Sequence, residues 1–287
     1  MANVRDIRRR IRSARNIQQI TRAMKFVSAA RLRKAQDRVV AARPYARQML
    51  AVLNSLATRV PEQSHPLLAR RGNEKIELVV ITADKGLCGA YNSNILRRSV
   101  EFLVTHGDKR VELNILGKRG RDFFRRRRSY TVKHEAVNIL QKANFADAAA
   151  ISREIIQEFE NGQQDEVWLV YNQFKSVVQQ NVVVEPLLPI QRLDHLEDAS
   201  RLEYLYDEPP ASIFGKLLPR HVEAQVFRAL LEAAAAEQGA RMTAMEAATN
   251  NATEMIDSLT LYANKVRQAG ITKELIEVVS GAASTGA

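Results

Sequence analysis

The chain has 287 residues, enough for one large domain or two small ones, and its apolar content of 46% is ordinary for a folded protein. No apolar run approaches the ~20 residues that span a bilayer. The single cysteine, Cys88, excludes an internal disulfide and is typical of a reducing compartment. The net charge is +11, but residues 1–60 hold 15 Lys and Arg against two Asp, so the excess belongs to one segment and indicates an anionic partner for it.

The first segment, residues 1–60, is predicted to form one long helix that pairs with another helix. Its apolar residues recur at alternating steps of three and four, as in a coiled coil, and Asn3 can cap the first turn. Pro44 removes one backbone hydrogen bond, so we expect the helix to bend or break there. The regular positions, which we call the seam, are Val4, Ile7, Ile11 and Ala14, and then Leu32, Ala35, Val39, Ala42, Ala46, Met49, Leu53, Leu56 and Val60.

Between these two runs the seam changes character. It falls there on four polar residues: Gln18, Thr21, Lys25 and Ser28. The nearby apolar residues each lie one position earlier: Ile17, Ile20, Met24 and Val27. One position is about 100° around a helix, so this stretch turns its apolar face away from the seam. Either the partner helix is followed irregularly here, or the apolar face touches a second surface.

The middle segment is predicted to be an α/β domain with a mostly parallel sheet. Five stretches have the composition of strands: residues 75–84, 111–117, 130–137, 165–174 and 177–190. Three stretches between them have helical periodicity: residues 92–106, 118–127 and 143–161. Because strands and helices alternate, right-handed crossovers would place most strands parallel to one another.

The third segment, residues 211–280, is predicted to be a second long helix that ends before Gly281, with weak points at Pro219 and Gly239. At 1.5 Å per residue a helix of roughly 60 residues is ~90 Å long, more than a small domain needs. We therefore expect an α/β fold plus a long antiparallel coiled coil of the N- and C-terminal helices, with a Rossmann-like α/β domain inserted between them. The expected division is 1–60, linker 61–74, 75–190, linker 191–210 and 211–287.

Residue types that carry chemistry are sparse. The stretch "ADKGLCGAYN" (83–92) follows a strand and opens a helix, but its spacing matches no phosphate-binding motif, so we expect a tight turn in which Asp84 caps a helix. Cys88 has no evident base, and the basic run 125–128 is typical of a solvated surface. No cofactor or metal is predicted. The histidines lack ligand spacing: His65, His106, His134, His195 and His221.

Two other functions remain open on these residues alone. A basic coiled coil could bind nucleic acid, although only Phe26 and Tyr45 offer aromatic stacking in the first 50 residues, and the charges overlap the seam itself. An α/β enzyme acting on nucleotides is the second alternative. ATP turnover by the purified chain would favour the enzyme, and salt-sensitive binding to specific duplex sites would favour the nucleic-acid protein.

Over nearly its whole length the chain resembles the gamma subunits of F-type ATP synthases of bacterial type, and four stretches carry the resemblance. They are "IRSARNIQQITRAMKFVSAARLRKAQ" (11–36), "DKGLCGAYN" (84–92), "EQGARMTAMEAATNNATEMI" (237–256) and "ITKELIEVVSGAAS" (271–284). The last one matches the family's terminal signature, I-T-x-E-x-x-[DE]-x-x-x-G-A-x-[SAKR], at every specified position.

The resemblance implies a non-catalytic rotor at the cytoplasmic face of the bacterial inner membrane. Such a subunit stands inside three alpha and three beta subunits, with its foot on the membrane c-ring and the epsilon subunit, and it couples proton flow to ATP synthesis or hydrolysis at the beta sites. Residues 24 and 25 would contact an acidic loop of a beta subunit, and residues 267 and 268 would make a contact higher in the ring. Residues 241, 272 and 274 match positions tied to coupling. The implied partner-contact residues are Met24, Lys25, Arg241, Arg267, Gln268, Thr272 and Glu274.

Overall fold

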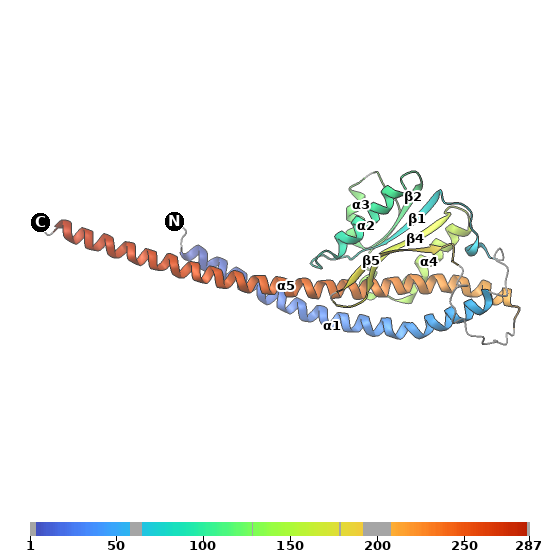
Figure 1. The fold of residues 1–287 in the computed structure, drawn as a ribbon, viewed down its shortest axis with the longest axis horizontal. Helices are drawn as coiled ribbons and strands as arrows, with labels where there is room; N and C mark the ends of the chain where they lie inside the picture. Colours follow the sequence, from blue (N-terminus) through green and yellow to red (C-terminus); the bar gives the residue numbers. More distant parts are fainter. Residues whose placement is uncertain (1–3, 58–64, 128, 178, 192–207, 286–287) are drawn as a thin grey trace. The chain divides into compact units, whose positions relative to one another are not determined.

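The protein is seen in a computed structural model that describes residues 4–57, 65–127, 129–177, 179–191 and 208–285 (Figure 1). These residues belong to two compact units, Met1–Val27 with Met242–Ala287, and Ser28–Arg241. None of the described helices is long and apolar enough to cross a membrane. The longer elements are, in chain order, α1 (Val4–Ala57), β1 (Lys75–Ile81), α2 (Tyr91–Thr105), β2 (Arg110–Leu116), α3 (Lys118–Arg125), β3 (Thr131–Ala136), α4 (Phe145–Glu160), β4 (Glu166–Phe174), β5 (Gln180–Leu188) and α5 (Pro210–Thr285).

The five predicted strands form one sheet in the order β3-β2-β1-β4-β5. The first four strands along the chain are parallel to their neighbours, and β5 pairs antiparallel with β4. The prediction of a mostly parallel sheet is therefore confirmed. Pro186 is accommodated in β5 because this strand is at the sheet edge, where a missing N–H donor interrupts no second ladder.

Alternate residues of β1 enter two separate cores, one on each face of the sheet. Ile76, Leu78 and Val80 pack with α2 and α3. Val79 and Ile81 face the opposite way and pack with α4 and with parts of α1 and α5. Figure 1 shows α2 and α3 on one side of the sheet and α4 on the other, next to the long helices. Both faces of a mainly parallel sheet are thus covered, as burial of its apolar strands requires.

Within the unit Ser28–Arg241, α5 is buried on several sides. Its alanine-rich stretch is fully enclosed, with Ala229, Ala233 and Ala236 at 0% exposure. Such small side chains let the sheet and α1 approach the helix backbone closely. At Gly239 a Cβ atom would lie 3.1 Å from the Gln180 side chain and 3.4 Å from that of Phe174, so β4 and β5 press directly on the helix at this point.

A break of α1 at Pro44 and the predicted end of α5 before Gly281 are wrong, whereas a bend at Pro44 or Pro219 stays a prediction. α1 continues through Pro44, and α5 continues through Pro219, because each proline removes a single backbone hydrogen bond from a helix whose burial is contributed by many side chains. α5 also passes Gly281 and ends at Thr285, since a helical glycine costs only about 1 kcal/mol. The predicted cap Asn3 lies outside the described residues, as does His195.

Candidate functional site

Polar side chains join α1 to α5 in the unit Met1–Val27 with Met242–Ala287. Gln18 Nε2 donates to Thr253 Oγ1 over 2.7 Å, the hydroxyls of Thr21 and Thr249 are 2.8 Å apart, and Lys25 Nζ lies 2.5 Å from Glu246 Oε1. The seven residues from Gln18 to Lys25 along α1 are matched by seven residues backwards along α5, from Thr253 to Glu246, so the helices run antiparallel. The polar seam positions predicted from sequence therefore do face the partner helix, and they follow it in a regular register.

The apolar residues of the same stretch point outward. Ile17 is 51% exposed and Ile20 is 59% exposed, whereas Ile7 and Ala14 on the seam are buried. Met24 is half-buried. Of the two interpretations of the phase shift, irregular pairing is wrong, because the polar pairs hold the register. The outward apolar side chains are available to a second surface.

The C-terminal candidates all lie on the exposed part of α5. Residues 267–280 are exposed throughout, including Arg267, Gln268 and Glu274, and the Thr272 hydroxyl donates to the Gln268 carbonyl over 3.0 Å. The apolar residues among them were not predicted from the sequence as contact residues, although their three- and four-residue spacing continues the helical pattern. These are Ile271, Leu275, Ile276, Val278 and Val279, which are 50–69% exposed. A contiguous apolar surface of this kind marks a protein interface.

Arg241 differs from the other candidates because it is buried inside the chain. It is 7% exposed, and its Nη2 donates to Glu237 Oε1 over 2.6 Å and to the Gly86 carbonyl over 3.3 Å. Burial raises the pKa of Glu237, and the Arg241 charge opposes that rise. The Tyr91 hydroxyl donates to the Ala233 carbonyl nearby, over 3.1 Å. Arg241 therefore ties the 84–92 loop to α5.

The 84–92 loop uses its polar groups internally. Asp84 Oδ1 accepts from the backbone N–H of Asn138 and from that of Lys118, the first residue of α3. Asp84 thus serves α3 and not α2, the helix that the loop opens, whose N-cap Ala90 forms no side-chain hydrogen bond. Asn92 holds the loop through the Ala83 N–H and donates to Cys88 Sγ. Cys88 is buried, and burial raises the pKa of its thiol. A buried thiol with a raised pKa is a poor nucleophile.

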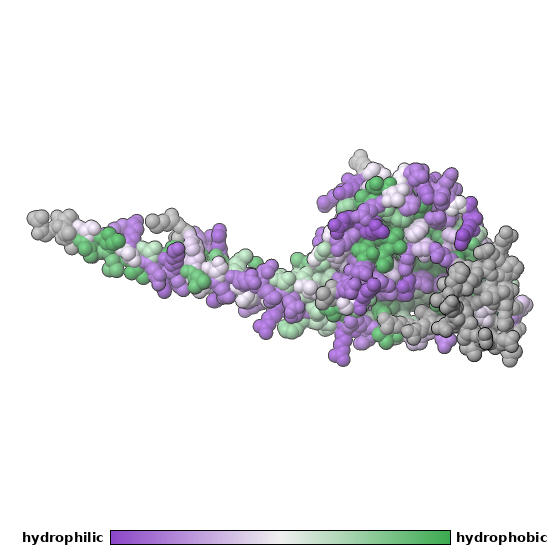
Figure 2. Space-filling model, viewed as in Figure 1, coloured by the Kyte–Doolittle hydropathy of each residue, from purple (hydrophilic) through white to green (hydrophobic). Residues whose placement is uncertain are grey.

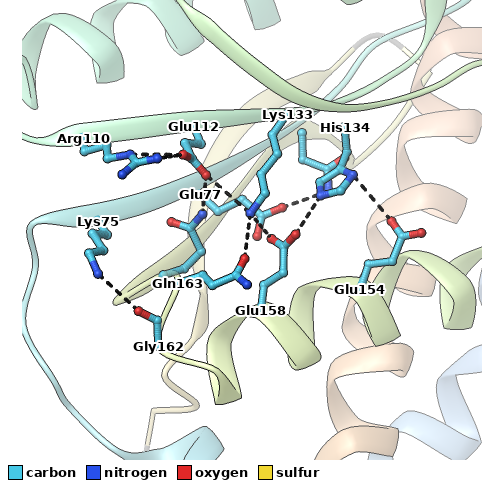
Figure 3. A network of polar contacts seen from close by, with 12 residues as sticks. Lys75, Glu77, Arg110, Glu112, Lys133, His134, Glu154, Glu158, Gly162 and Gln163 are labelled. Carbon is cyan, nitrogen blue, oxygen red and sulfur yellow. Dashed lines mark hydrogen bonds and ion pairs between the residues drawn. The ribbon is translucent and has the colours of Figure 1, made fainter.

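Charged side chains between α4 and the sheet form a second polar cluster (Figure 3). Lys133 Nζ lies 2.8 Å from Glu158 Oε2 and 3.5 Å from Glu112 Oε2. His134 Nε2 is 2.8 Å from Glu158 Oε1. Burial alone would raise the pKa of Glu112, but hydrogen bonds from Gln164 and Arg110 lower it. These ion pairs fasten α4 to β2 and β3. Among the residues that the structure describes, no group of three His, Cys, Asp or Glu could hold a metal ion.

Glu77 is the one carboxyl next to this cluster that is fully buried and only half satisfied. It is 0% exposed, its Oε1 accepts from Asn114 Nδ2 over 2.9 Å, and its Oε2 has no hydrogen-bond partner among the described residues. Burial raises the pKa of Glu77 to about 7, against an opposing effect of the Asn114 hydrogen bond. The fold therefore favours the protonated carboxyl.

The family model described as ATP synthase matches residues 3–285. An ATP synthase gamma chain from Solibacter usitatus (strain Ellin6076) is 50% identical over 288 residues, which cover 99% of each chain. Another, from Anaeromyxobacter sp. (strain Fw109-5), is 47% identical over 98% of this chain and 99% of its own. The chain belongs to the ATP synthase gamma-chain family.

Solved structures agree with this assignment. A chain in the central stalk and c-ring structure of the Tetrahymena thermophila mitochondrial ATP synthase aligns with a TM-score of 0.62 and 29% identity, over 80% of this chain and 99% of that one. A chain of the Euglena gracilis mitochondrial ATP synthase has a TM-score of 0.70 at 21% identity, over 98% of this chain and 94% of that one. At that identity the Euglena structure supports the gamma-chain fold alone.

Arg241→Met is expected to lower the free energy of unfolding by about 3 kcal/mol, because it leaves the Glu237 carboxylate buried without its cation. Urea unfolding of the purified chain measures this. Adding Glu237→Gln should recover part of the loss by removing the charge. Arg267→Met, at an exposed position of the same helix, is the control and should change little. Equal effects of the two arginine substitutions would contradict an internal role for Arg241.

Glu77→Gln is expected to remove a pH dependence of stability. The folded protein keeps the Glu77 proton up to about pH 7, whereas the ordinary pKa of a glutamate side chain is 4.5. This group's stabilising contribution is therefore fully present below pH 4.5 and is lost as pH rises to about 7, with a change of about 3 kcal/mol. Unfolding curves between these pH values should show the wild type losing stability relative to the variant. Glu74→Gln, at an exposed position, should keep the wild-type profile, and a parallel profile for Glu77→Gln would contradict the assignment.

Proposed function

We propose that this chain is the central-stalk rotor subunit of a proton-translocating F-type ATP synthase and has no catalytic site of its own. The observation that carries the proposal is near-full-length identity of 50% to a gamma chain, joined to a helix pair whose apolar residues point outward. Rotation of this chain inside the alpha and beta subunits couples proton flow through the membrane c-ring to ATP synthesis or hydrolysis at the beta subunits.

The proposed partners are three alpha and three beta subunits, the epsilon subunit and the c-ring. The complex would hold the chain as a peripheral protein at the cytoplasmic face of the bacterial inner membrane. Support comes from the aligned chains, which belong to a central stalk with its c-ring in Tetrahymena and to an assembly of OSCP, F1 and c-ring in Euglena.

The helix pair has the properties that a rotating shaft needs. Its polar hydrogen bonds fix the register of α1 against α5, which resists sliding of one helix along the other. Its outward face is chemically uneven, with apolar residues such as Ile17 and Ile20 beside the arginines of α1. An uneven surface presents a different contact to each surrounding subunit as the shaft turns, and this is how rotation would change the state of each beta site.

The seven candidate residues divide into three proposed roles. Met24 and Lys25 would lie against an acidic beta loop, with Lys25 also held by Glu246. The exposed residues Arg267, Gln268, Thr272 and Glu274 would contact beta subunits directly. Arg241 would support coupling from inside the chain, by holding the 84–92 loop on α5.

The expected domain division at residues 60, 75, 190 and 211 remains part of the proposal. Nucleic-acid binding gains no support from the relatives described above. An α/β nucleotide enzyme is also disfavoured, because the spacing of the 84–92 loop matches no phosphate-binding motif.

The rotor assignment is tested by reconstituting the chain with alpha and beta subunits and attaching a bead through Lys175→Cys. Lys175 is exposed, and the native Cys88 is buried, so the label reaches one site. ATP should drive rotation of the bead, while the isolated chain should hydrolyse no ATP. Failure to co-purify with alpha and beta subunits, or ATP hydrolysis by the chain alone, would overturn the assignment.

Arg267→Ala with Gln268→Ala tests the proposed beta contact. A guanidinium and a neighbouring amide can donate several directed hydrogen bonds, and charged hydrogen bonds are worth ~1.5–3 kcal/mol each. We expect lower complex yield or lower torque at unchanged helix content of the isolated chain. Asn264→Ala with Lys265→Ala removes an exposed amide and cation one turn earlier and should have less effect. Wild-type yield, hydrolysis rate and torque in the first variant would contradict the proposed beta contact and leave the rotor assignment unchanged.

A further inference from the structure

A groove of about 1040 Å³ lies between α2 and α3 and the 84–92 loop, on the face of the sheet opposite α4. Figure 2 shows hydrophobic surface over α2 and α3, bordered by hydrophilic side chains. None of the seven partner-contact candidates lines this groove. It is therefore a separate surface from the shaft helices.

The walls of the groove carry a large excess of positive charge. Four arginines line it, and all four are exposed. Among the described residues, none of the four forms an ion pair within the chain, in contrast to most arginines around them. They are Arg97, Arg119, Arg126 and Arg127. Part of the basic run 125–128, which the sequence analysis treated as solvated surface, thus belongs to a shaped site.

The two carboxylates in the lining do not neutralise these arginines, because each already has a cation outside the groove. Glu101 pairs with Arg98 at 3.0 Å, and Asp122 pairs with Arg121 at 3.0 Å. Arg127 is held in place by the ring of Phe123, whose centroid lies 3.8 Å from the guanidinium carbon. At least one of the free cations is therefore oriented before any partner arrives.

The floor between the arginines is apolar and open to solvent. Val104 is 73% exposed and Leu87 is 64% exposed, both in the lining of the groove. Leu87 also has a φ of 62°, a left-handed conformation that costs a non-glycine residue about 1–2 kcal/mol. Burial within this chain does not offset that cost. An apolar side chain held out in this way would be stabilised by a partner that covers it.

We propose that this groove binds an amphipathic helix of a partner protein chain, one with an acidic face and an apolar face. Cations flank an apolar floor, so the matching surface has carboxylates on both sides of a row of apolar side chains. The groove lies between two helices and not along a strand edge, which favours a helix over an added strand. The α2 residues in its lining span about 20 Å at 1.5 Å per residue, the length of roughly 14 helical residues.

A free polyphosphate matches the groove less well. Its charge would meet the open apolar side chains of Leu87 and Val104. The backbone donors next to the loop, at Lys118 and Asn138, are taken by Asp84. The experiment must therefore distinguish binding of an amphipathic helix from binding of a polyphosphate.

The first test measures binding of a fluorescent synthetic helix of about 14 residues, with glutamates on one face and leucines on the other, to the full chain. Arg97→Glu with Arg126→Glu should weaken binding about tenfold or more. Leu87→Ser with Val104→Ser should also weaken it, and this loss should persist at high salt, where exposed charge interactions are screened.

The matched control is Arg153→Glu with Lys175→Glu, which makes the same change in net charge at exposed positions of the α/β domain outside the groove. It should leave peptide affinity close to wild type. Equal losses in the two charge-reversed variants would show attraction to net charge alone and overturn the proposal. Displacement of the peptide by pyrophosphate at the peptide's own concentration would assign the groove to polyphosphate and also overturn it.

A second test identifies the partner in the assembled membrane complex. A photocrosslinking side chain at position 104, in the groove floor, should form an adduct with a segment of another chain whose acidic and apolar residues recur at helical spacing. The same side chain at position 175 should not label that segment. An adduct with a basic segment, or no adduct in complexes that assemble and hydrolyse ATP normally, would overturn the assignment.

Discussion

The antiparallel pairing of α1 with α5 is the constraint on which the rest of the structure depends. A helix of 54 residues and another of 76 cannot bury an apolar stripe alone, so each needs the other. In the unit Ser28–Arg241 the two helices share an apolar core with the sheet, through residues such as Leu53 and Val222. In the other unit the seam is held by hydroxyl, amide and ammonium groups. Directed polar bonds fix the register there, next to buried apolar seam residues such as Ile7 and Ala14.

Because polar residues occupy the seam at Gln18, Thr21 and Lys25, the apolar residues one position earlier remain outside. Ile20 and Leu275 are each about 60% exposed, and full burial of such a side chain is worth roughly 1.5–3 kcal/mol. Burying several of them against another protein would therefore release a large free energy that the isolated chain does not gain. The isolated chain leaves these apolar side chains uncovered. In the proposed rotor, the same side chains are the ones that contact the surrounding subunits.

Hydrophobic periodicity predicted the strands, the helices and the seam to within a few residues, because burial decides those features locally. Local signals failed at Pro44 and Pro219, where the packing of many side chains outweighed one lost hydrogen bond. They also failed at Gly281, because a helical glycine costs only about 1 kcal/mol. The sequence also gave no sign that Arg241 is buried, since its partner carbonyl at Gly86 lies 155 residues away along the chain. The same limit applies to Asp84. It binds the first N–H of α3, at Lys118, and α3 comes next to Asp84 only when the sheet folds.

The 84–92 loop connects two surfaces that would otherwise act independently. On one side, Arg241 holds the Gly86 carbonyl, and the Tyr91 hydroxyl bonds the backbone of α5 at Ala233. On the other side, Leu87 forms part of the groove floor. Leu87 follows Gly86 directly, so any force on an occupant of the groove reaches α5 within a few bonds, through groups that are buried and already oriented. A loop built in this way needs no catalytic chemistry to be functional, because its rigidity joins a binding surface to a shaft.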